Sequence, residues 1–281
     1  MSSKLVMEAE REIEGLLRGF PKALRVWEAV KKDPEVAASW EMANYIAVRK
    51  MKYSDHGEAH AKIVAANALK MLDLLEEAGV EPDIVRDGLG DRDDARVVVL
   101  LAALLHDIGN QVDREGHGFY SAVLASGVVN RLLSTVYEDP CKRTVIKGFI
   151  LHAIHTHMEE ALSRTIEASV VKVADGTDMT KGRSRLPFDM GNVNIHTVSA
   201  MSIERVEVAR GSEKPVEIRV YMTNSAGIFQ VEEILYRKLE SSAITDYVDI
   251  LAVTVPEGSP VDERVVRKIV TMGGRLKHLT D

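Results

Sequence analysis

Apolar residues recur every three or four positions through the first part of the chain. Ile13, Leu16 and Leu17 show this spacing, which continues to about Glu77 with an interruption at Pro34. Such spacing places apolar side chains on one face of an α-helix, and a proline marks the place where one helix ends and another begins. The pattern therefore predicts a series of amphipathic helices over this part of the chain.

One stretch of the chain is apolar at every position. It covers Val97–Leu105 and is followed directly by His106 and Asp107. Because it is far shorter than the roughly 20 residues of a membrane-spanning helix, we expect a buried helix of a globular domain. The segment 79–94 before it is rich in Gly and Asp and predicts a surface loop, and Gly109 after it fits a left-handed C-terminal cap.

The spacing of apolar residues changes beyond Lys181. Before that point the pattern predicts further helices at about 118–137, 139–157 and 163–179. Beyond it, apolar and polar residues alternate with the period of two that is typical of a β-strand. The expected elements are strands at about 206–209 and 216–222, a helix at about 231–240, a strand at 247–255, and a last short helix after the break at 256–260.

These elements predict a mainly α protein. We expect an all-helical domain over residues 1–180, with the helices of residues 1–50 packed against the rest of it. A small α+β domain with an antiparallel sheet is expected over residues 181–281.

Composition narrows the class of protein. Hydrophobic residues make up 46% of the chain, which is enough for a full core, and 36 Lys and Arg against 43 Asp and Glu leave a net charge of -7. This balance does not favour a nucleic acid as partner. The one cysteine, Cys141, has no partner for an internal disulfide, and the acidic N-terminus lacks the apolar core of a signal peptide. We therefore expect a cytoplasmic protein without a membrane partner.

Histidines concentrate in the middle of the chain, where seven of the nine lie between His56 and His157. A helical scaffold builds a metal site from imidazoles and carboxylates on different helices, because one helix face offers only two or three ligands. The candidate ligands are His60, His106, Asp107, His117, His157 and Asp175. A single histidine is more commonly an ordinary core or surface residue, and this is our interpretation of His196 and His278.

The order of these residues, together with their neighbours, resembles the HD-domain metal-dependent phosphohydrolases. The resemblance is carried by His60 with Ile63-Val64-Ala65, by Leu104-Leu105-His106-Asp107-Ile108-Gly109, and by Val173-Ala174-Asp175. It covers about Tyr53 to Met179 and implies a helical HD domain. Two branches of the family are disfavoured. Asn110-Gln111 stands where the cyclic-di-nucleotide branch carries a Lys and where the alarmone-hydrolysing branch carries acidic residues, and the chain has no Gly-Tyr-Pro.

The resemblance also implies roles for single residues. His60, His106, Asp107 and Asp175 match the ligands of a first divalent ion, with His106 and Asp107 at the catalytic centre. His117 and His157 match the histidines that hold a second ion in the two-metal branches, with Asp107 as the bridge; His155 or His152 is the alternative to His157. One or two ions are expected, and Mn, Fe, Co, Ni, Zn and Mg all suit such ligands.

The expected reaction is hydrolysis of a phosphate ester or anhydride of a small phosphorylated substrate, for which a nucleotide is the first expectation. Substrate-binding roles are predicted for Lys181, Arg183, Arg185 and His56, and supporting roles beside the ligands for Asp178 and His155. Two alternatives stay open. The basic segment after Lys181 is also typical of a solvated loop, and the protein could be a non-catalytic regulatory module that acts through its C-terminal domain. A homodimer is expected from the exposed edge and apolar face of the sheet.

Overall fold

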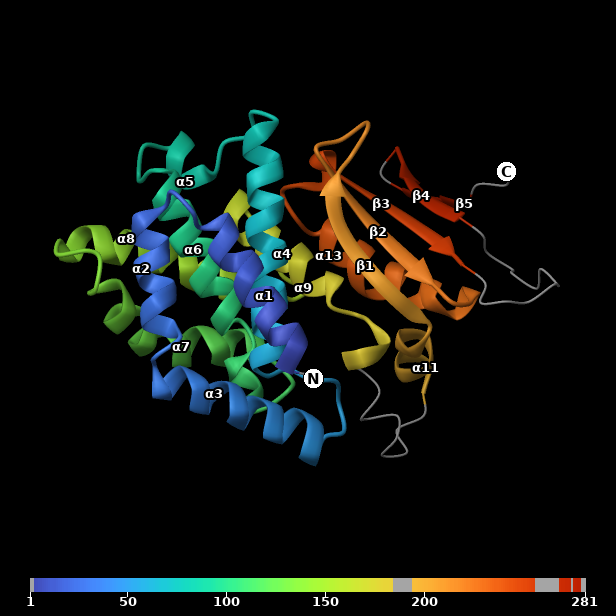
Figure 1. Cartoon of the computed structure of the whole chain (residues 1–281), viewed down its shortest axis with the longest axis horizontal. Helices are drawn as coiled ribbons and strands as arrows, with labels where there is room; N and C mark the ends of the chain where they lie inside the picture. The colour runs from blue at the N-terminus through green and yellow to red at the C-terminus, as the bar shows by residue number, and fades with distance from the viewer. Residues whose placement is uncertain (1–2, 184–193, 256–267, 274, 279–281) are drawn as a thin grey trace.

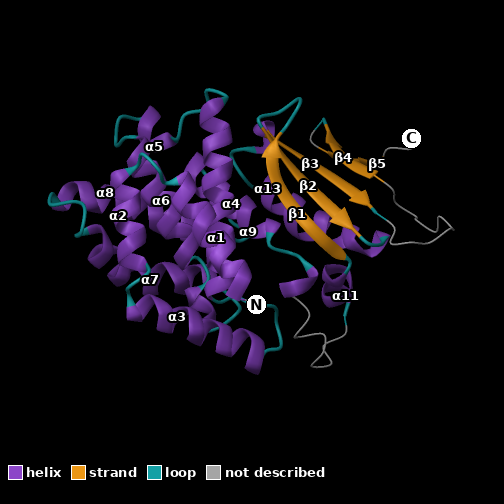
Figure 2. Cartoon of the chain, viewed as in Figure 1, coloured by secondary structure: helices purple, strands orange, loops and turns teal. Residues whose placement is uncertain are grey.

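The helical part of the molecule and its β-sheet lie side by side (Figure 1). The computed structural model describes residues 3–183, 194–255, 268–273 and 275–278. Helices make up the chain from Ser3 to Thr177, and the first strand begins only at Ile203 (Figure 2). The prediction of a mainly α protein with a smaller α+β part is confirmed.

The N-terminal helices begin where the sequence places its prolines and capping residues. Asp33 caps one of them, because its carboxylate accepts hydrogen bonds from the backbone amides of Glu35 and Val36, and Pro34 occupies the first helical turn. The elements are α1 (Ser3–Leu16), α2 (Pro21–Val30), α3 (Pro34–Asn44), the π-helical segment η1 (Tyr45–Lys50) and α4 (Glu58–Glu77). The amphipathic helices predicted for this part of the chain are therefore present.

The apolar run forms the buried helix α6 (Arg92–Leu105), in which every residue after Arg92 is buried. A capping box closes its first turn, because Asp91 and Asp94 each accept a hydrogen bond from the other's backbone amide. The segment predicted as a loop before it contains the short helix α5 (Asp83–Arg86). The remaining elements of the helical part are the 3-10 segment η2 (Ile108–Gln111), α7 (His117–Leu133), α8 (Pro140–His155) and α9 (Ile166–Thr177).

Gly109 does not form the left-handed cap that the sequence predicted. Its backbone φ angle is not positive, and the residue lies within η2. Its role is to let two segments approach each other. A Cβ atom at this position would lie 2.2 Å from the backbone oxygen of His117 and 2.4 Å from the backbone nitrogen of Ser121. A side chain here would therefore push α7 away from the segment that carries His106 and Asp107.

The C-terminal part contains a sheet with strand order β1-β2-β3-β4-β5, so the strands follow each other in sequence order. The strands are β1 (Ile203–Arg210), β2 (Val216–Met222), β3 (Val248–Thr254), β4 (Lys268–Met272) and β5 (Arg275–His278). The pair β2 and β3 is parallel and the other pairs are antiparallel. The predicted antiparallel sheet is thus wrong at one pair. The reason is the helical connection between β2 and β3, because a parallel pair requires such a crossover.

Further helices accompany the sheet. They are α11 (Ile195–Met201) before β1 and, between β2 and β3, the segments η3 (Ser225–Gly227), α12 (Ile228–Gln230), η4 (Val231–Tyr236), α13 (Arg237–Glu240) and η5 (Thr245–Tyr247). The helix predicted near residues 231–240 is therefore confirmed. The last short helix was expected directly after the break at 256–260, and the described residues from Lys268 on form β4 and β5. Residues 256–267 lie outside the described part.

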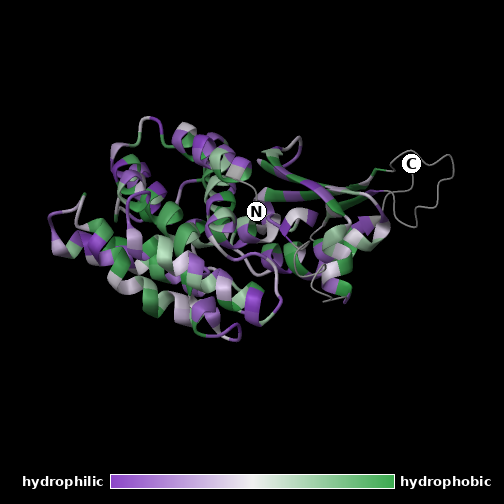
Figure 3. Cartoon of the chain, turned by 60° about the horizontal axis from the view of Figure 1, so that its bottom comes forward, coloured by the Kyte–Doolittle hydropathy of each residue, from purple (hydrophilic) through white to green (hydrophobic). Residues whose placement is uncertain are grey.

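One continuous apolar core joins the two parts of the molecule. It includes residues of the helical part, such as Leu101 and Val171, and residues of the sheet, such as Ile218 and Ile250. Hydrophobic and hydrophilic residues alternate around the helices, as packing against this core requires (Figure 3). Helix α9 lies between the two parts, because it contacts α4, α6 and α8 on one side and α13 and η4 on the other. Among the described helices, none has the length and hydropathy of a membrane crossing.

Candidate metal centre

The structure brings all the predicted ligands to one place. His60 lies on α4, His106 and Asp107 lie between α6 and η2, and Asp175 lies on α9. The Nε2 atom of His60 is 3.1 Å from Nε2 of His106, 3.1 Å from Oδ1 of Asp175 and 3.2 Å from Oδ2 of Asp107. These four residues are called the His60 cluster below.

His117 and His157 form a second group on the other side of Asp107. Their Nε2 atoms are 3.0 Å apart, and Nε2 of His117 is 3.2 Å from Oδ1 of Asp107. Nε2 of His157 is 3.8 Å from the same oxygen. His117, His157 and Asp107 are called the His117 cluster. Asp107 therefore presents one oxygen to each cluster.

Hydrogen bonds at Nδ1 decide which ring nitrogen of each histidine faces the centre. In His106, His117 and His157, Nδ1 lies close to the backbone oxygen of the residue three positions earlier. The distances from Nδ1 to that oxygen are 2.7 Å at Ala103, 2.9 Å at Arg114 and 2.6 Å at Ile154. A carbonyl oxygen only accepts, so Nδ1 carries the proton and donates it. The lone pair of a neutral ring is then at Nε2, where a metal ligand needs it.

The donor set fits divalent ions. His60 is oriented in the same way as the others, but by a carboxylate, since its Nδ1 is 2.7 Å from Oδ2 of Asp178. Nε2 atoms with lone pairs repel one another at about 3 Å unless a cation lies between them. In addition, Oδ2 of Asp107 is buried and has no hydrogen-bond partner among the described residues. Facing lone pairs and an unsatisfied carboxylate oxygen are the features that a bound cation resolves.

The electrostatics agree with this conclusion. Burial lowers the pKa of His60, but the carboxylates of Asp107, Asp175 and Asp178 outweigh burial and raise that pKa to about 10. Burial likewise lowers the pKa of His106, which Asp107 and Asp175 raise to about 9. Burial raises the pKa of Asp107, yet the surrounding imidazoles hold it well below its usual value. The carboxylates thus favour a positive charge at His60 and His106, be it a proton or a metal ion.

Comparison with known proteins places this site in a family. The HD domain model matches residues 57–180, a range that contains every residue of both clusters. A protein of Methanocaldococcus jannaschii, the uncharacterized protein MJ1020, is 46% identical over 249 residues, which are 89% of this chain and 95% of that protein. The chain belongs to the HD-domain family. No solved structure matches it.

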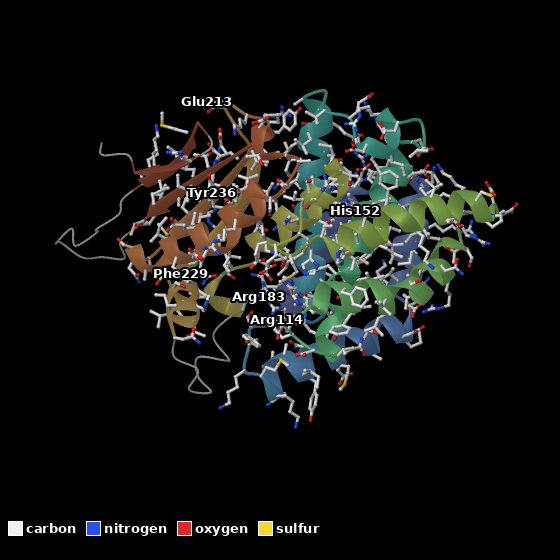
Figure 4. The ribbon with its side chains drawn as sticks, turned by 180° about the vertical axis from the view of Figure 1, so that it is seen from behind. Arg114, His152, Arg183, Glu213, Phe229 and Tyr236 are labelled. Atoms are coloured by element: carbon white, nitrogen blue, oxygen red, sulfur yellow. The ribbon has the colours of Figure 1, made fainter. Side chains whose placement is uncertain are left out.

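A cavity of about 300 Å³ opens over the candidate metal centre of the HD domain. Asp107, His117 and Asp175 form part of its wall, together with Arg114 and Arg183. Seen from behind, these two arginines lie close to each other at the junction between the helical and the C-terminal parts (Figure 4). The candidate metal centre is therefore open to a small molecule at a point that both parts of the chain enclose.

Both guanidinium groups point at imidazoles of the clusters. Nη2 of Arg183 is 3.2 Å from Nε2 of His60, while its other nitrogens donate to the backbone oxygens of Asp55 and Asp178. Nη1 of Arg114 is 3.4 Å from Nε2 of His117 and 3.2 Å from Nε2 of His56. Each cluster thus has an arginine at its edge.

Not every predicted site residue lies at the centre. Lys181 pairs with Glu204 and is largely exposed, so it does not line the cavity. The side chain of His155 is exposed on the outside of α8, and His157 is the histidine of this stretch that reaches the cluster. His56 does line the cavity, with Nδ1 2.6 Å from the backbone oxygen of Ser54. Arg185 lies outside the described residues.

Sequence reasoning missed three residues of the site. Arg114 precedes His117 by three positions and shares its turn, so its position was a signal that could have found it. His196, interpreted as an ordinary residue, lines the cavity from α11. Lys238 reaches the centre from α13, and nothing in its local sequence indicates this. The last two come from the C-terminal part, whose placement over the HD domain only the fold reveals.

Proposed function

We propose that this protein is a metal-dependent phosphohydrolase in which the two clusters hold two divalent ions that share Asp107. The observation that carries the proposal is the position of Asp107, whose two carboxylate oxygens face two separate sets of imidazole Nε2 atoms. Divalent ions at such a centre activate water and neutralise charge on a phosphoryl group. We assign His60, His106 and Asp175 to the first ion, and His117 and His157 to the second.

The residues around the centre support a phosphorylated substrate. Arg183 and Arg114 lie at the edges of the two clusters, and guanidinium groups bind phosphate oxygens with paired N–H donors. His56 accepts a hydrogen bond from Arg114 and so holds it in place. Burial lowers the pKa of His56 well below its usual value, which keeps this ring neutral and able to accept. The arginines hold the phosphate, and the carboxylates hold the ions.

A small nucleotide suits the size and lining of the cavity. Its volume of about 300 Å³ is at the lower end of small-molecule sites and leaves no room for a polymer inside it. Apolar and amide side chains also line the cavity, among them Met179, Ile234 and Gln230, which suit a base or a sugar. Residence in the cytoplasm and homodimerisation stay predictions from the sequence.

Metal analysis combined with a substrate panel tests the proposal. The purified protein is expected to bind two equivalents of Mn²⁺ and to release phosphate from nucleotides or other small phosphate esters. Asp107→Ala should lose both properties, whereas Asp87→Ala, which removes an exposed carboxylate away from the cavity, should keep both. A wild-type protein that binds no divalent ion and hydrolyses nothing would contradict the proposal and favour the regulatory alternative.

A further inference from the structure

Lys238 extends from the C-terminal part of the chain into the metal centre of the HD domain. Its side chain is almost completely buried, with 5% exposed. The ammonium nitrogen is 2.9 Å from Oδ2 of Asp175, 2.8 Å from the backbone oxygen of His157 and 3.5 Å from Oε2 of Glu159. The ammonium group of Lys238 therefore contacts a residue of each cluster and lies among three acceptors.

Helix α9 has a glycine where the stem of this lysine crosses it. A Cβ atom on Gly176 would lie 3.2 Å from Cδ of Lys238 and 3.3 Å from Cα of Leu235, which is tighter than an ordinary contact. Gly176 follows Asp175 directly, so the missing side chain opens the path to that carboxylate. The crossing helix includes the π-helical segment η4, and such segments are frequent at functional sites.

The two carboxylate oxygens of Asp175 contact different partners. Oδ2 is held by Lys238, and Oδ1 faces Nε2 of His60 in the centre. Burial lowers the pKa of Lys238, but Asp175 and Glu159 outweigh burial and raise it, so the side chain is charged. A buried carboxylate that loses such a partner is left unpaired and turns to find another. The direction of Oδ1 thus depends on the contact at Oδ2.

We propose that Lys238 is a positioning residue for the metal centre, which fixes the Asp175 carboxylate and the backbone of His157 so that the C-terminal part completes the site. The inference rests on the proposed function, because it takes both residues as metal ligands. The ammonium group of Lys238 is held between protein acceptors, so we assign it orientation and not proton transfer. Residues that orient ligands in this way commonly contribute about ten- to a hundredfold to metal affinity.

Calorimetric titration of the full chain with Mn²⁺ tests the inference. Lys238→Met should weaken binding of Mn²⁺ by about tenfold or more, while KM for the substrate at saturating Mn²⁺ stays within about twofold. Lys238→Arg should restore part of the affinity, because a guanidinium also pairs with a carboxylate. If only charge mattered, Lys238→Met would bind Mn²⁺ more tightly, because the positive charge of the lysine repels the metal ion. Unchanged or tighter binding in Lys238→Met would overturn the inference.

Lys172 provides a matched control for the loss of a buried lysine at the same junction. It is fully buried on α9, and its ammonium donates to the backbone oxygens of Ala161 and Ser241 without contacting either cluster. Lys172→Met should lower the melting temperature and leave Mn²⁺ affinity unchanged. Equal losses of affinity in both lysine variants would show a general structural role and would also overturn the inference.

A second variant keeps the test valid if Lys238→Met does not fold. Gly176→Ala places a methyl group against Lys238 and Leu235, and it should weaken Mn²⁺ binding severalfold. Gly148→Ala is its control, because a Cβ atom at that glycine of α8 meets nothing within 4 Å. Unchanged affinity in a folded Gly176→Ala protein would count against the inference. Wild-type protein that binds no Mn²⁺ would instead remove the proposed function, and the inference with it.

Discussion

In the His60 cluster the imidazole of His60 is oriented by a carboxylate of a distant helix, whereas in the His117 cluster both imidazoles are oriented by backbone oxygens of their own turns. The clusters also differ in charge. Two carboxylates, Asp107 and Asp175, lie at Nε2 of His60, whereas among the described residues only Asp107 lies at Nε2 of His117 and His157. The orientation of His60 therefore depends on the packing of α9 against α4, whereas that of His117 and His157 depends on local backbone structure. We therefore expect the first ion to bind more tightly than the second.

The largest effect is expected where the two clusters meet. Asp107→Ala removes the only residue they share, so both ions should be lost and hydrolysis should fall by about a thousandfold or more, since each ion stabilises the transition state by several kcal/mol. Elemental analysis and single-turnover kinetics measure the two losses. A variant that kept one tightly bound ion would show that the two clusters bind their ions independently.

Removal of one ligand from each cluster should separate the two ions. Asp175→Ala takes a carboxylate from the His60 cluster, and we expect the tight ion to be lost because the remaining charge is too small to hold it. His117→Ala should leave one tight ion, since the His60 cluster stays complete. Stoichiometry from calorimetry distinguishes the variants. Loss of the tightly bound ion in His117→Ala would contradict the expectation that the first ion binds more tightly than the second.

The sequence predicted the features of this centre that local patterns encode, and it missed those that depend on contacts between distant segments. The candidate ligands were predicted from their order in the chain and from the family resemblance of the segments around them, such as the end of the apolar run. The mistake at Gly109 arose because local spacing describes a helix end but not the approach of α7, which is what requires a glycine there. His155 was given a supporting role because it lies two residues before His157, but the turn that follows α8 leaves it outside.

The rest of the fold shows the same limit. Period-two alternation revealed β2 and β3 but not their relative direction, which the helix between them decides. Lys238 carries no local signal, because its function comes from the placement of α13 over Gly176 and Asp175. Sequence patterns predict elements and the chemistry within them. Contacts between residues far apart in the chain depend on tertiary packing, and it is these contacts that distinguish the His60 cluster.

A smaller effect is expected at Asp178, the carboxylate that orients His60. Asp178→Asn keeps the size of the side chain but removes its charge, and an amide accepts a hydrogen bond from the imidazole less strongly. Affinity for the first ion should fall by about ten- to a hundredfold, and affinity for the second should stay within about twofold. Competition with a metal-sensitive dye measures both constants. Equal losses at the two ions would indicate a general disturbance, which Asp113→Asn, an exposed carboxylate outside the cavity, controls for.

The last test changes no residue, because it compares the pH dependence of the two ions. The pKa of His60 is raised to about 10 and that of His106 to about 9, so at neutral pH both rings hold a proton that a metal ion must displace. The affinity of the first ion should therefore rise as pH increases towards these values and fall as pH decreases, by about tenfold per pH unit for each proton released.

The His117 cluster should respond less to pH. Burial is the main cause that lowers the pKa of His157 well below its usual value, so this ring is neutral at pH 7 and releases no proton when an ion binds. Titrations in buffers of different ionisation enthalpy count the protons released with each ion. Release of more protons with the first ion than with the second would support the difference in charge between the two clusters. The ion at the His60 cluster has to replace the protons that the carboxylates attract to His60 and His106. Release of equal numbers of protons with the two ions would therefore show that these carboxylates do not determine the metal affinity of the His60 cluster.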